Sequence, residues 1–298
     1  METILSIDGV SKSYKNIKAL KNLSLTIPKG SVFGILGPNG SGKTTMMSIV
    51  LDILKADAGT YNWFGLPNSN NERKRIGSLL ETPNFYHYLS AVDNLKITQA
   101  ISGRGTEADI EEVLEMVKLT ERKKSKFSAY SLGMKQRLAI GAALLGNPEI
   151  LLLDEPTNGL DPVGIMEIRD LIKALAKKGI TIIIASHLLD EVEKICTHVA
   201  ILKRGSLITS GPVNEVLSNE DIVEIAAANM EQLKSCIAEM GGFTLIKEEN
   251  ERLQIHYPFG TANMEMINNH CFKNGITLQL LVSKKKSLES TFFELTND

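Results

Sequence analysis

Residues 37–44 read GPNGSGKT, which matches the spacing G-x-x-x-x-G-K-[ST] of a phosphate-binding P-loop. The apolar residues 31–36 before it predict a buried strand, and Met47, Val50 and Leu54 after it fall at helical spacing. A glycine-rich loop between a strand and a helix turns backbone N–H groups and the positive end of the helix dipole toward a polyphosphate. The stretch therefore predicts a nucleotide-binding P-loop rather than a glycine-rich turn before an ordinary helix.

The composition is that of an ordinary globular chain. Its 298 residues suggest about two domains, and 43% of them are hydrophobic and 23% charged. The net charge of −2 gives no basic excess, so nucleic acid is not an expected partner. The three cysteines are scattered and odd in number, which argues against a disulfide framework and favours a reducing compartment.

Neither a signal peptide nor a membrane span is expected. The chain passes from Met1 directly into a strand-like segment at residues 3–8. Its longest apolar run, residues 180–185, is far shorter than a membrane-spanning helix. If the protein works at a membrane, it does so through another chain.

Strand and helix patterns alternate along the first two thirds of the chain, which predicts an α/β fold with a doubly wound sheet of the P-loop NTPase type. Helical periodicity at residues 95–101, 110–119 and 132–145 interrupts this alternation. We interpret residues 84–146 as an inserted helical subdomain. The aromatic residues at its entrance, around Tyr86, are either core or a surface that faces a partner.

Polar residues follow four of the predicted strands: the P-loop, Glu81, Asp154-Glu155 and His187. Ligands of a doubly wound parallel sheet bind outside the carboxyl ends of its strands, so these segments should gather at one edge. Adjacent acids are common on surfaces, but directly after four apolar residues they indicate a site. Asp154 is expected near Mg²⁺, and Glu155 is expected to polarise the attacking water as a general base. A lone histidine is usually structural, yet from this strand end His187 could reach a γ-phosphate.

A series of motifs in the expected order makes the chain similar to the ATP-binding subunits of ABC transporters over about residues 1–218. Tyr14 matches the adenine-stacking aromatic, although its local sequence alone favours a surface tyrosine in a hairpin. Residues 151–155 match the Walker B motif with its catalytic Glu155, residues 158–161 match the D-loop, and His187 matches the switch histidine. The resemblance places these Walker A residues on the nucleotide: Gly37, Pro38, Asn39, Gly40, Ser41, Gly42, Lys43, Thr44 and Thr45.

Two departures from the family pattern narrow the resemblance. The signature usually reads Leu-Ser-Gly-Gly-Gln. Here Leu132, after Ser131, replaces the first glycine, and Met134, after Gly133, replaces the glutamine. Glu81 stands where the family usually has glutamine; it could ligate Mg²⁺ with Thr44 and Asp154, or raise the pKa of a neighbouring acid. With both departures, the sequence resembles exporters of the bacitracin and lantibiotic self-protection type.

The resemblance implies ATP and Mg²⁺ as cofactors and an ATP-dependent homodimer arranged head to tail. Ser131 and Gly133 would then act on the nucleotide that Lys43 of the other subunit holds, and Asp161 would lie across the interface or serve as a plain helix cap. A separate membrane permease would be the partner. The expected location is cytoplasmic and peripheral on the inner face of the membrane, and the expected function is ATP-driven export of a peptide antibiotic or similar amphiphile.

Two other functions remain to be weighed. A soluble ABC ATPase acting on ribosomes or nucleic acid is less consistent with this chain, because such relatives carry tandem cassettes or long coiled coils. A regulator that binds ATP without hydrolysing it is disfavoured by the presence of Glu155 and His187.

Residues 221–298 predict a separate small α+β domain. Strand and helix patterns follow in the order β-α-β-β-α-β, which resembles a ferredoxin-like fold, and residues 288–295 predict a short last helix. We see no catalytic constellation there, so the domain is expected to serve dimerisation or regulation.

Overall fold

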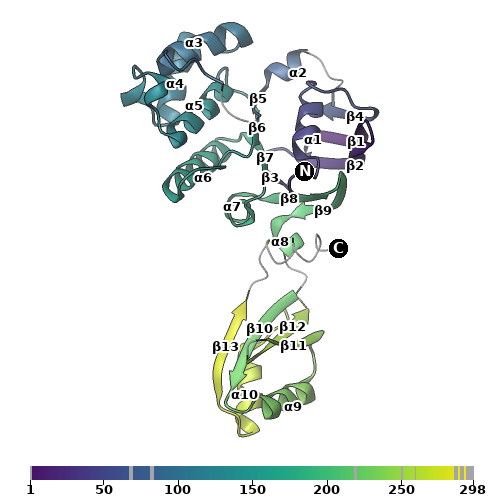
Figure 1. Cartoon of the computed structure of the whole chain (residues 1–298). Coiled ribbons are helices and arrows are strands. Elements are labelled where there is room, and N and C mark those ends of the chain that lie inside the picture. The colour runs from purple at the N-terminus through teal and green to yellow at the C-terminus, as the bar shows by residue number, and fades with distance from the viewer. Residues whose placement is uncertain are drawn as a thin grey trace. The chain divides into compact units, whose positions relative to one another are not determined.

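The computed structural model describes residues 2–66, 70–80, 84–217, 220–249, 251–258, 260–284, 288 and 292. The chain forms two compact units, Met1–Gly211 and Pro212–Asp298 (Figure 1). No helix within the described part of the chain reaches the length and hydrophobicity that crossing a lipid bilayer requires.

The centre of the first unit is a six-stranded sheet with the order β5-β6-β7-β3-β8-β9. β5 (Ile76–Leu79), β6 (Ile150–Asp154), β7 (Thr181–Ser186), β3 (Val32–Leu36) and β8 (His198–Lys203) pair in parallel, and β9 (Ser206–Pro212) completes the sheet. Every residue of β3, β6 and β7 is buried, which explains why these strands appear in the sequence as continuous apolar runs. The order confirms the predicted doubly wound P-loop fold and sets the ends of β5, β6, β7 and β3 side by side.

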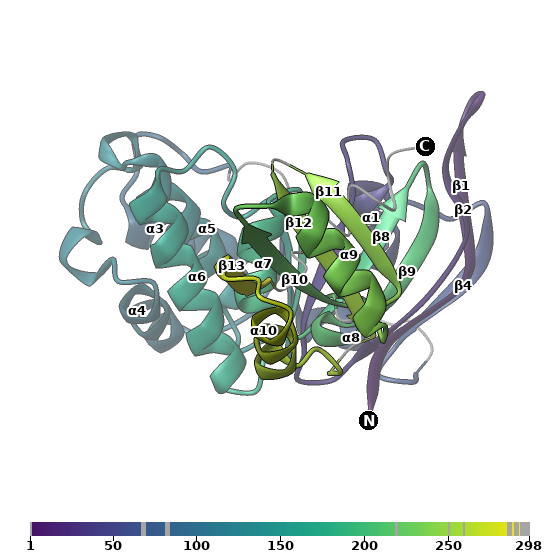
Figure 2. The ribbon, with the colours of Figure 1, turned by 90° about the horizontal axis from the view of Figure 1, so that it is seen from below.

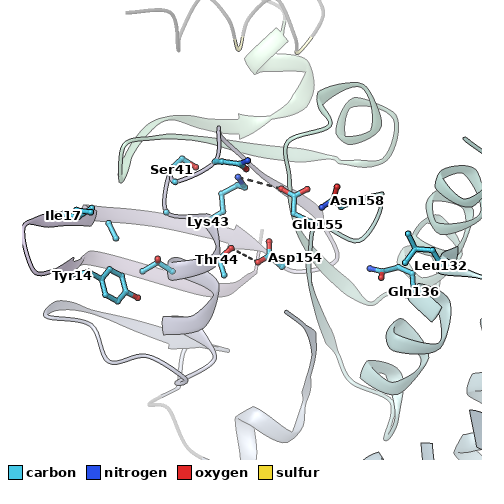
Figure 3. A pocket seen from close by; sticks show the side chains of 15 residues that line it. Tyr14, Ile17, Ser41, Lys43, Thr44, Leu132, Gln136, Asp154, Glu155 and Asn158 are labelled. Atoms are coloured by element: carbon cyan, nitrogen blue, oxygen red, sulfur yellow. Dashed lines mark hydrogen bonds and ion pairs between the residues drawn. The ribbon is translucent and has the colours of Figure 1, made fainter. Parts of the chain in front are cut away.

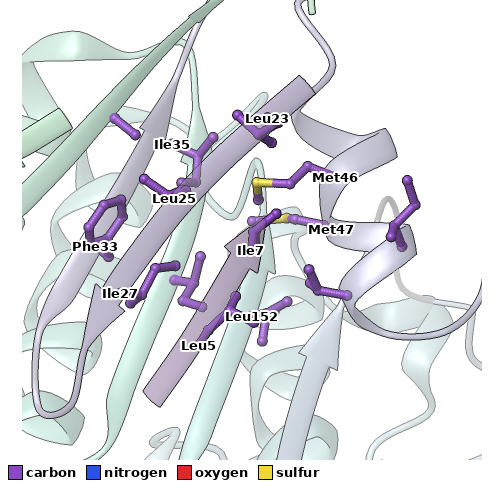
Figure 4. Packing of buried hydrophobic residues seen from close by; sticks show 14 of the residues in the cluster. Leu5, Ile7, Leu23, Leu25, Ile27, Phe33, Ile35, Met46, Met47 and Leu152 are labelled. Carbon is purple, nitrogen blue, oxygen red and sulfur yellow. The ribbon is translucent and has the colours of Figure 1, made fainter. Parts of the chain in front are cut away.

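A second, antiparallel sheet packs against the first. Its order is β2-β1-β4, formed by β1 (Thr3–Tyr14), β2 (Ile17–Pro28) and β4 (Ala58–Trp63). Figure 4 shows alternate residues such as Leu5, Leu25 and Ile27 pointing into a core shared with β3, β6 and helix α1 (Lys43–Val50). Each fully buried aliphatic side chain contributes about 1.5–3 kcal/mol, so this core holds α1 and the loop before it firmly in place.

The inserted helical subdomain comprises α3 (Ala91–Ser102), α4 (Glu107–Met116) and α5 (Leu132–Leu144), with 3₁₀ turns at Thr120–Arg122 and Phe127–Ala129. α3 and α4 each begin with a capping box, Ser90 with Asp93 and Thr106 with Asp109. Figure 2 shows the subdomain at the opposite end of the unit from the β2-β1-β4 sheet. At its entrance the rings of Phe85 and Phe127 pack 5.1 Å apart, centroid to centroid, while Tyr86 is half exposed.

Helix α6 (Pro162–Lys177) follows β6, as its sequence predicts, whereas three short helices were not predicted. They are α2 (Asn70–Lys74), α7 (Leu189–Ile195) and α8 (Val213–Leu217). Each spans two turns or fewer, which is too short for a helical period to stand out in the sequence.

The second unit has a ferredoxin-like fold, as predicted. Its elements are β10 (Glu220–Ala227), α9 (Met230–Met240), β11 (Leu245–Glu249), β12 (Arg252–Pro258), α10 (Met264–Lys273) and β13 (Leu278–Lys284). They form an antiparallel sheet of order β11-β12-β10-β13, and both helices pack against one face of it through a core that includes Val223, Ile255, Ile237 and Ile267. The last helix predicted, at residues 288–295, falls outside the described residues apart from 288 and 292.

Candidate active site

A pocket of about 630 Å³ opens beside the loop between β3 and α1, at the carboxyl end of β6 (Figure 3). It brings together residues from distant parts of the sequence, including most of those predicted to bind a nucleotide. Its lining consists of Tyr14, Ile17, Ala19, Asn39, Gly40, Ser41, Gly42, Lys43, Thr44, Thr45, Leu132, Gln136, Asp154, Glu155 and Asn158.

The loop of residues 37–42 depends on glycine for two different reasons. Gly42 precedes α1 with φ +106°, a conformation that a side chain disfavours. A Cβ at Gly37 would lie 2.3 Å from Ser41 Oγ and 2.4 Å from the carbonyl oxygen of Leu202, so the loop could not close with any larger residue. The Ser41 side chain is buried, and its Oγ has no hydrogen-bond partner among the described residues.

Lys43 lies folded back on this loop. Its Nζ donates to the carbonyl oxygens of Gly37 (2.8 Å) and Pro38 (3.4 Å) and lies 3.9 Å from Glu155 Oε1. The side chain is nearly inaccessible, and its burial lowers the pKa of Lys43, while the charges of Glu155 and Asp154 act in the opposite direction. The Lys43 ammonium group is therefore surrounded by oxygen atoms, and phosphate oxygens of the same character could take their place.

Thr44 and Asp154 form a second pair in the pocket. Thr44 Oγ1 donates to Asp154 Oδ2 at 2.7 Å, so the first turn of α1 is bonded to the last residue of β6. A hydroxyl and a carboxylate are the oxygen ligands that Mg²⁺ prefers, usually together with substrate phosphates. The residues present therefore fit this ion.

Glu155 follows β6 in a strained backbone conformation with φ +49°. Two backbone hydrogen bonds hold it there: Glu155 N donates to the Ala185 carbonyl (2.9 Å), and Asn158 N donates to the Glu155 carbonyl (3.1 Å). Such conformations cost about 1–3 kcal/mol and concentrate at functional sites. The turn brings the carboxylate to His187, whose Nδ1 lies 2.8 Å from Glu155 Oε2, while Oε1 faces Lys43.

Tyr14 lies in a hairpin and also at the edge of the pocket. It pairs with Ile17 at the end of the β1–β2 hairpin, and 44% of its surface is exposed, yet it also lines the pocket. Figure 3 shows it on the side of the pocket opposite Leu132 and Gln136. An aromatic face is thus available at the rim, beyond the phosphate-binding loop.

Ser131, Gly133 and Asp161, the signature and D-loop residues predicted to bind a nucleotide, do not line this pocket within one chain. Ser131 caps α5 by accepting a hydrogen bond from Met134 N, and Asp161 caps α6 by accepting one from Gly164 N. Gly133 lies in the first turn of α5 and does not line the pocket either. Glu81, predicted as a metal ligand, lies outside the described residues.

Not every residue at or beneath the pocket was predicted from the sequence. Gln136 lines it, and so does Asn158, which the sequence placed only in the D-loop segment 158–161. Gly205 supports the loop: its N–H donates to the Ser41 carbonyl (3.0 Å), and its carbonyl accepts from Lys21 N (2.8 Å). The first two could have been found from their position beside Ser131 and Glu155; the third gave no local signal.

A glycine loop after a parallel strand, facing a carboxylate pair at the end of a second strand of the same sheet, with one strand between them, defines a P-loop nucleoside triphosphatase. A family model described as ABC transporter matches residues 20–158. The bacitracin transport ATP-binding protein BcrA of Enterococcus faecalis is 34% identical over 99% of this chain and 97% of its own length. The lantibiotic transport ATP-binding protein SrtF of Streptococcus pyogenes is 38% identical over 74% of this chain and 99% of its own length.

Among solved structures, the dimeric post-hydrolysis state of the ATP-binding cassette MJ0796, bound to ADP and Pi, matches with a TM-score of 0.63 and 28% identity over 70% of this chain and 99% of that one. This chain belongs to the ATP-binding subunits of ABC transporters, and it is an ATPase of that family. The alternative of a soluble ATPase acting on ribosomes or nucleic acid is not favoured, because these relatives are named as transport proteins.

Proposed function

We propose that the chain hydrolyses Mg²⁺-ATP to drive a separate membrane permease that exports a peptide antibiotic or a similar amphiphile. The observation that carries the catalytic part is the arrangement of Lys43 and Thr44 opposite Glu155 and Asp154. The transport part is supported by the names of the bacitracin and lantibiotic relatives, of which BcrA is matched over nearly its full length.

In this proposal the phosphates lie on the loop of residues 37–45, and Tyr14 stacks on the adenine. Lys43 exchanges the Gly37 and Pro38 carbonyls for β- and γ-phosphate oxygens. Mg²⁺, held by Thr44 and Asp154, would neutralise charge that develops on those oxygens. The predicted third acid, Glu81, is left out of this scheme because it lies outside the described residues.

Hydrolysis then needs a base that reaches the attacking water. Glu155 is proposed for that role because its carboxylate faces the P-loop lysine, and it would accept the water proton. His187 is proposed to hold that carboxylate through Oε2 and to reach the γ-phosphate side of the site. The strained turn at Glu155 fixes the base before the substrate arrives.

The functional unit proposed is an ATP-dependent homodimer. Ser131, Gly133 and Asp161 do not line the pocket of their own chain, so they are available to a nucleotide held by a second copy. The dimeric cassette structure supports this arrangement. Through the permease the dimer would lie on the inner, cytoplasmic face of the membrane, with the second unit, residues 212–298, as a dimerisation or regulatory domain.

The catalytic proposal is tested with Glu155→Gln, which preserves shape and removes the base. ATP turnover should fall by about 10²–10⁴-fold while ATP binding and ATP-induced dimerisation persist. Glu115→Gln, on an exposed face of α4, is the matched control and should leave turnover unchanged. Wild-type turnover in Glu155→Gln would show that another group is the base.

The transport proposal is tested by affinity purification from native cells in mild detergent, followed by mass spectrometry. We expect a polytopic membrane protein in near-equal amount. Recovery of ribosomal or DNA-associated proteins, with no membrane partner even after crosslinking, would refute the transport proposal while leaving the ATPase assignment intact.

A further inference from the structure

The nucleotide pocket is poor in positive charge. Among the described residues that line it, Lys43 is the cation, and Asp154 and Glu155 are the anions. Lys43 is moreover buried and close to both of them. The pocket by itself therefore repels a polyphosphate at a distance, although its backbone N–H groups can bind one after contact.

A basic hollow adjoins this pocket at the tip of the P-loop. It has a volume of about 450 Å³ and is lined by Asn16, Ile17, Lys18, Lys21, Gly40 and Arg204. Ile17 and Gly40 line both spaces, so the hollow and the pocket lie next to each other. A Cβ at Gly40 would meet no atom within 4 Å, which shows that the loop tip faces open space.

The three cations of the hollow are exposed and are not neutralised. Lys18, Lys21 and Arg204 form no ion pair with any other described residue. Their positions are set by rigid elements: Lys18 and Lys21 lie on β2, and Arg204 lies in the β8–β9 turn, whose Gly205 is bonded to Lys21 N and to the Ser41 carbonyl.

We propose that Lys18, Lys21 and Arg204 form an electrostatic capture surface that draws nucleoside polyphosphates toward the P-loop and raises their association rate constant. Concentrated charge beside a binding site raises association rates by about 10–10³-fold, and this gain falls steeply with ionic strength. Charges at a rim act mainly on the association rate and its salt dependence, so the dissociation rate should change little. The inference rests on the proposed nucleotide site, because it assigns a route into that site.

The test is stopped-flow binding of the fluorescent nucleotide MANT-ATP to the full chain in EDTA, which prevents hydrolysis. The variant is Lys18→Gln/Lys21→Gln/Arg204→Gln. The control is Lys124→Gln/Lys173→Gln/Lys177→Gln, which removes the same total charge at exposed positions that line neither space. We expect the association rate constant of the first variant to fall about tenfold at low salt and that of the control to fall less than twofold.

Two further arms identify the cause. The rate loss should shrink from MANT-ATP to MANT-ADP to MANT-AMP, because the attraction scales with ligand charge. It should nearly vanish at 1 M salt, where the Debye length is about 3 Å. An unchanged association rate, or a loss that is equal for all three ligands and independent of salt, overturns the proposal. Failure of wild type itself to bind MANT-ATP would instead overturn the proposed nucleotide site.

Discussion

Gly205→Ala is the substitution that most directly tests how the P-loop is supported. Gly205 lies in the β8–β9 turn with φ +83°, donates to the Ser41 carbonyl and accepts from Lys21 N. A Cβ there would lie 2.6 Å from the Ala19 carbonyl oxygen and 2.9 Å from its carbon. The turn would have to move away from β2, and the hydrogen bond to the P-loop would lengthen with it.

Two costs add in this variant. Alanine in a left-handed backbone conformation costs about 1–2 kcal/mol. Overpacking against fixed backbone atoms costs about 1–3 kcal/mol more. We therefore expect the free energy of unfolding of the first unit to fall by about 2–5 kcal/mol. If the displaced loop also binds nucleotide about tenfold more weakly, the binding free energy of the nucleotide becomes less favourable by about 1.4 kcal/mol.

Urea unfolding followed by tryptophan fluorescence measures the first of these effects. Trp63 is the only tryptophan in the sequence, and it is buried in the core of the first unit with its Nε1 donating to the Val50 carbonyl (2.7 Å), so it reports that unit alone. Gly179→Ala is the matched control. It has the same kind of backbone conformation, φ +89°, but its Cβ would meet no atom within 4 Å.

The difference between the two variants isolates the contact with Ala19, because both carry the same conformational cost. We expect Gly205→Ala to be the less stable by about 1–3 kcal/mol and to be the only one of the two with weakened nucleotide binding. Equal stability losses, or unaltered MANT-ATP affinity in a destabilised Gly205→Ala, would refute the idea that this turn supports the P-loop.

Two other predictions concern buried charges. Arg104 Nη1 and Nη2 donate to the carbonyls of Ile76 (2.9 Å) and Ala143 (3.1 Å), and burial lowers the pKa of Arg104. Arg104→Met should therefore lower the free energy of unfolding of the first unit by about 2–4 kcal/mol in urea unfolding, and Arg104→Lys should have an intermediate effect. Unchanged stability in Arg104→Met would contradict this prediction. Hydrogen bonds, first from Lys284 and then from Gln254 and Arg252, lower the pKa of the buried Glu224. Its charged form therefore stabilises the second unit at pH values above the pKa of the unfolded carboxyl group. This contribution is lost as pH falls through the lower pKa of the folded state. Glu224→Gln should thus weaken hydrogen-exchange protection of β10 and β12 at pH 7 by about 1–3 kcal/mol. This loss should shrink as pH falls through the lowered folded pKa, and a loss that does not change with pH would exclude a charge effect.

The sequence predicted the residues of the site better than it predicted their surroundings. The P-loop, Asp154 and Glu155 were recognisable because each lies directly beside an apolar strand whose length and burial are local properties. The gathering of the segments that follow β3 and β6 at one edge of the sheet was then expected from the general rule for parallel sheets, whereas the strand order itself came from the structure. The structure confirms that fold, whereas the roles assigned to the individual residues remain predictions.

The antiparallel sheet shows where local information ended. The sequence predicted a strand at residues 3–8, but it did not indicate that β1 pairs with β4, which is more than forty residues away, in a sheet separate from the central one. The short α7 was missed because tertiary packing, rather than an amphipathic period, stabilises a helix of seven residues.

The sequence alone determined the phosphate-binding loop, the acids that face it, the inserted helices and the ferredoxin-like second unit. These depend on glycine positions, apolar runs and periodicity, which are properties of neighbouring residues. Only the tertiary structure decided that Glu155 reaches both His187 and Lys43, that Gly205 supports Ser41, and that Lys18, Lys21 and Arg204 gather at the mouth of the pocket. Those contacts join segments far apart in the chain, and no local pattern specifies which of many distant partners a side chain will meet once the sheets have packed.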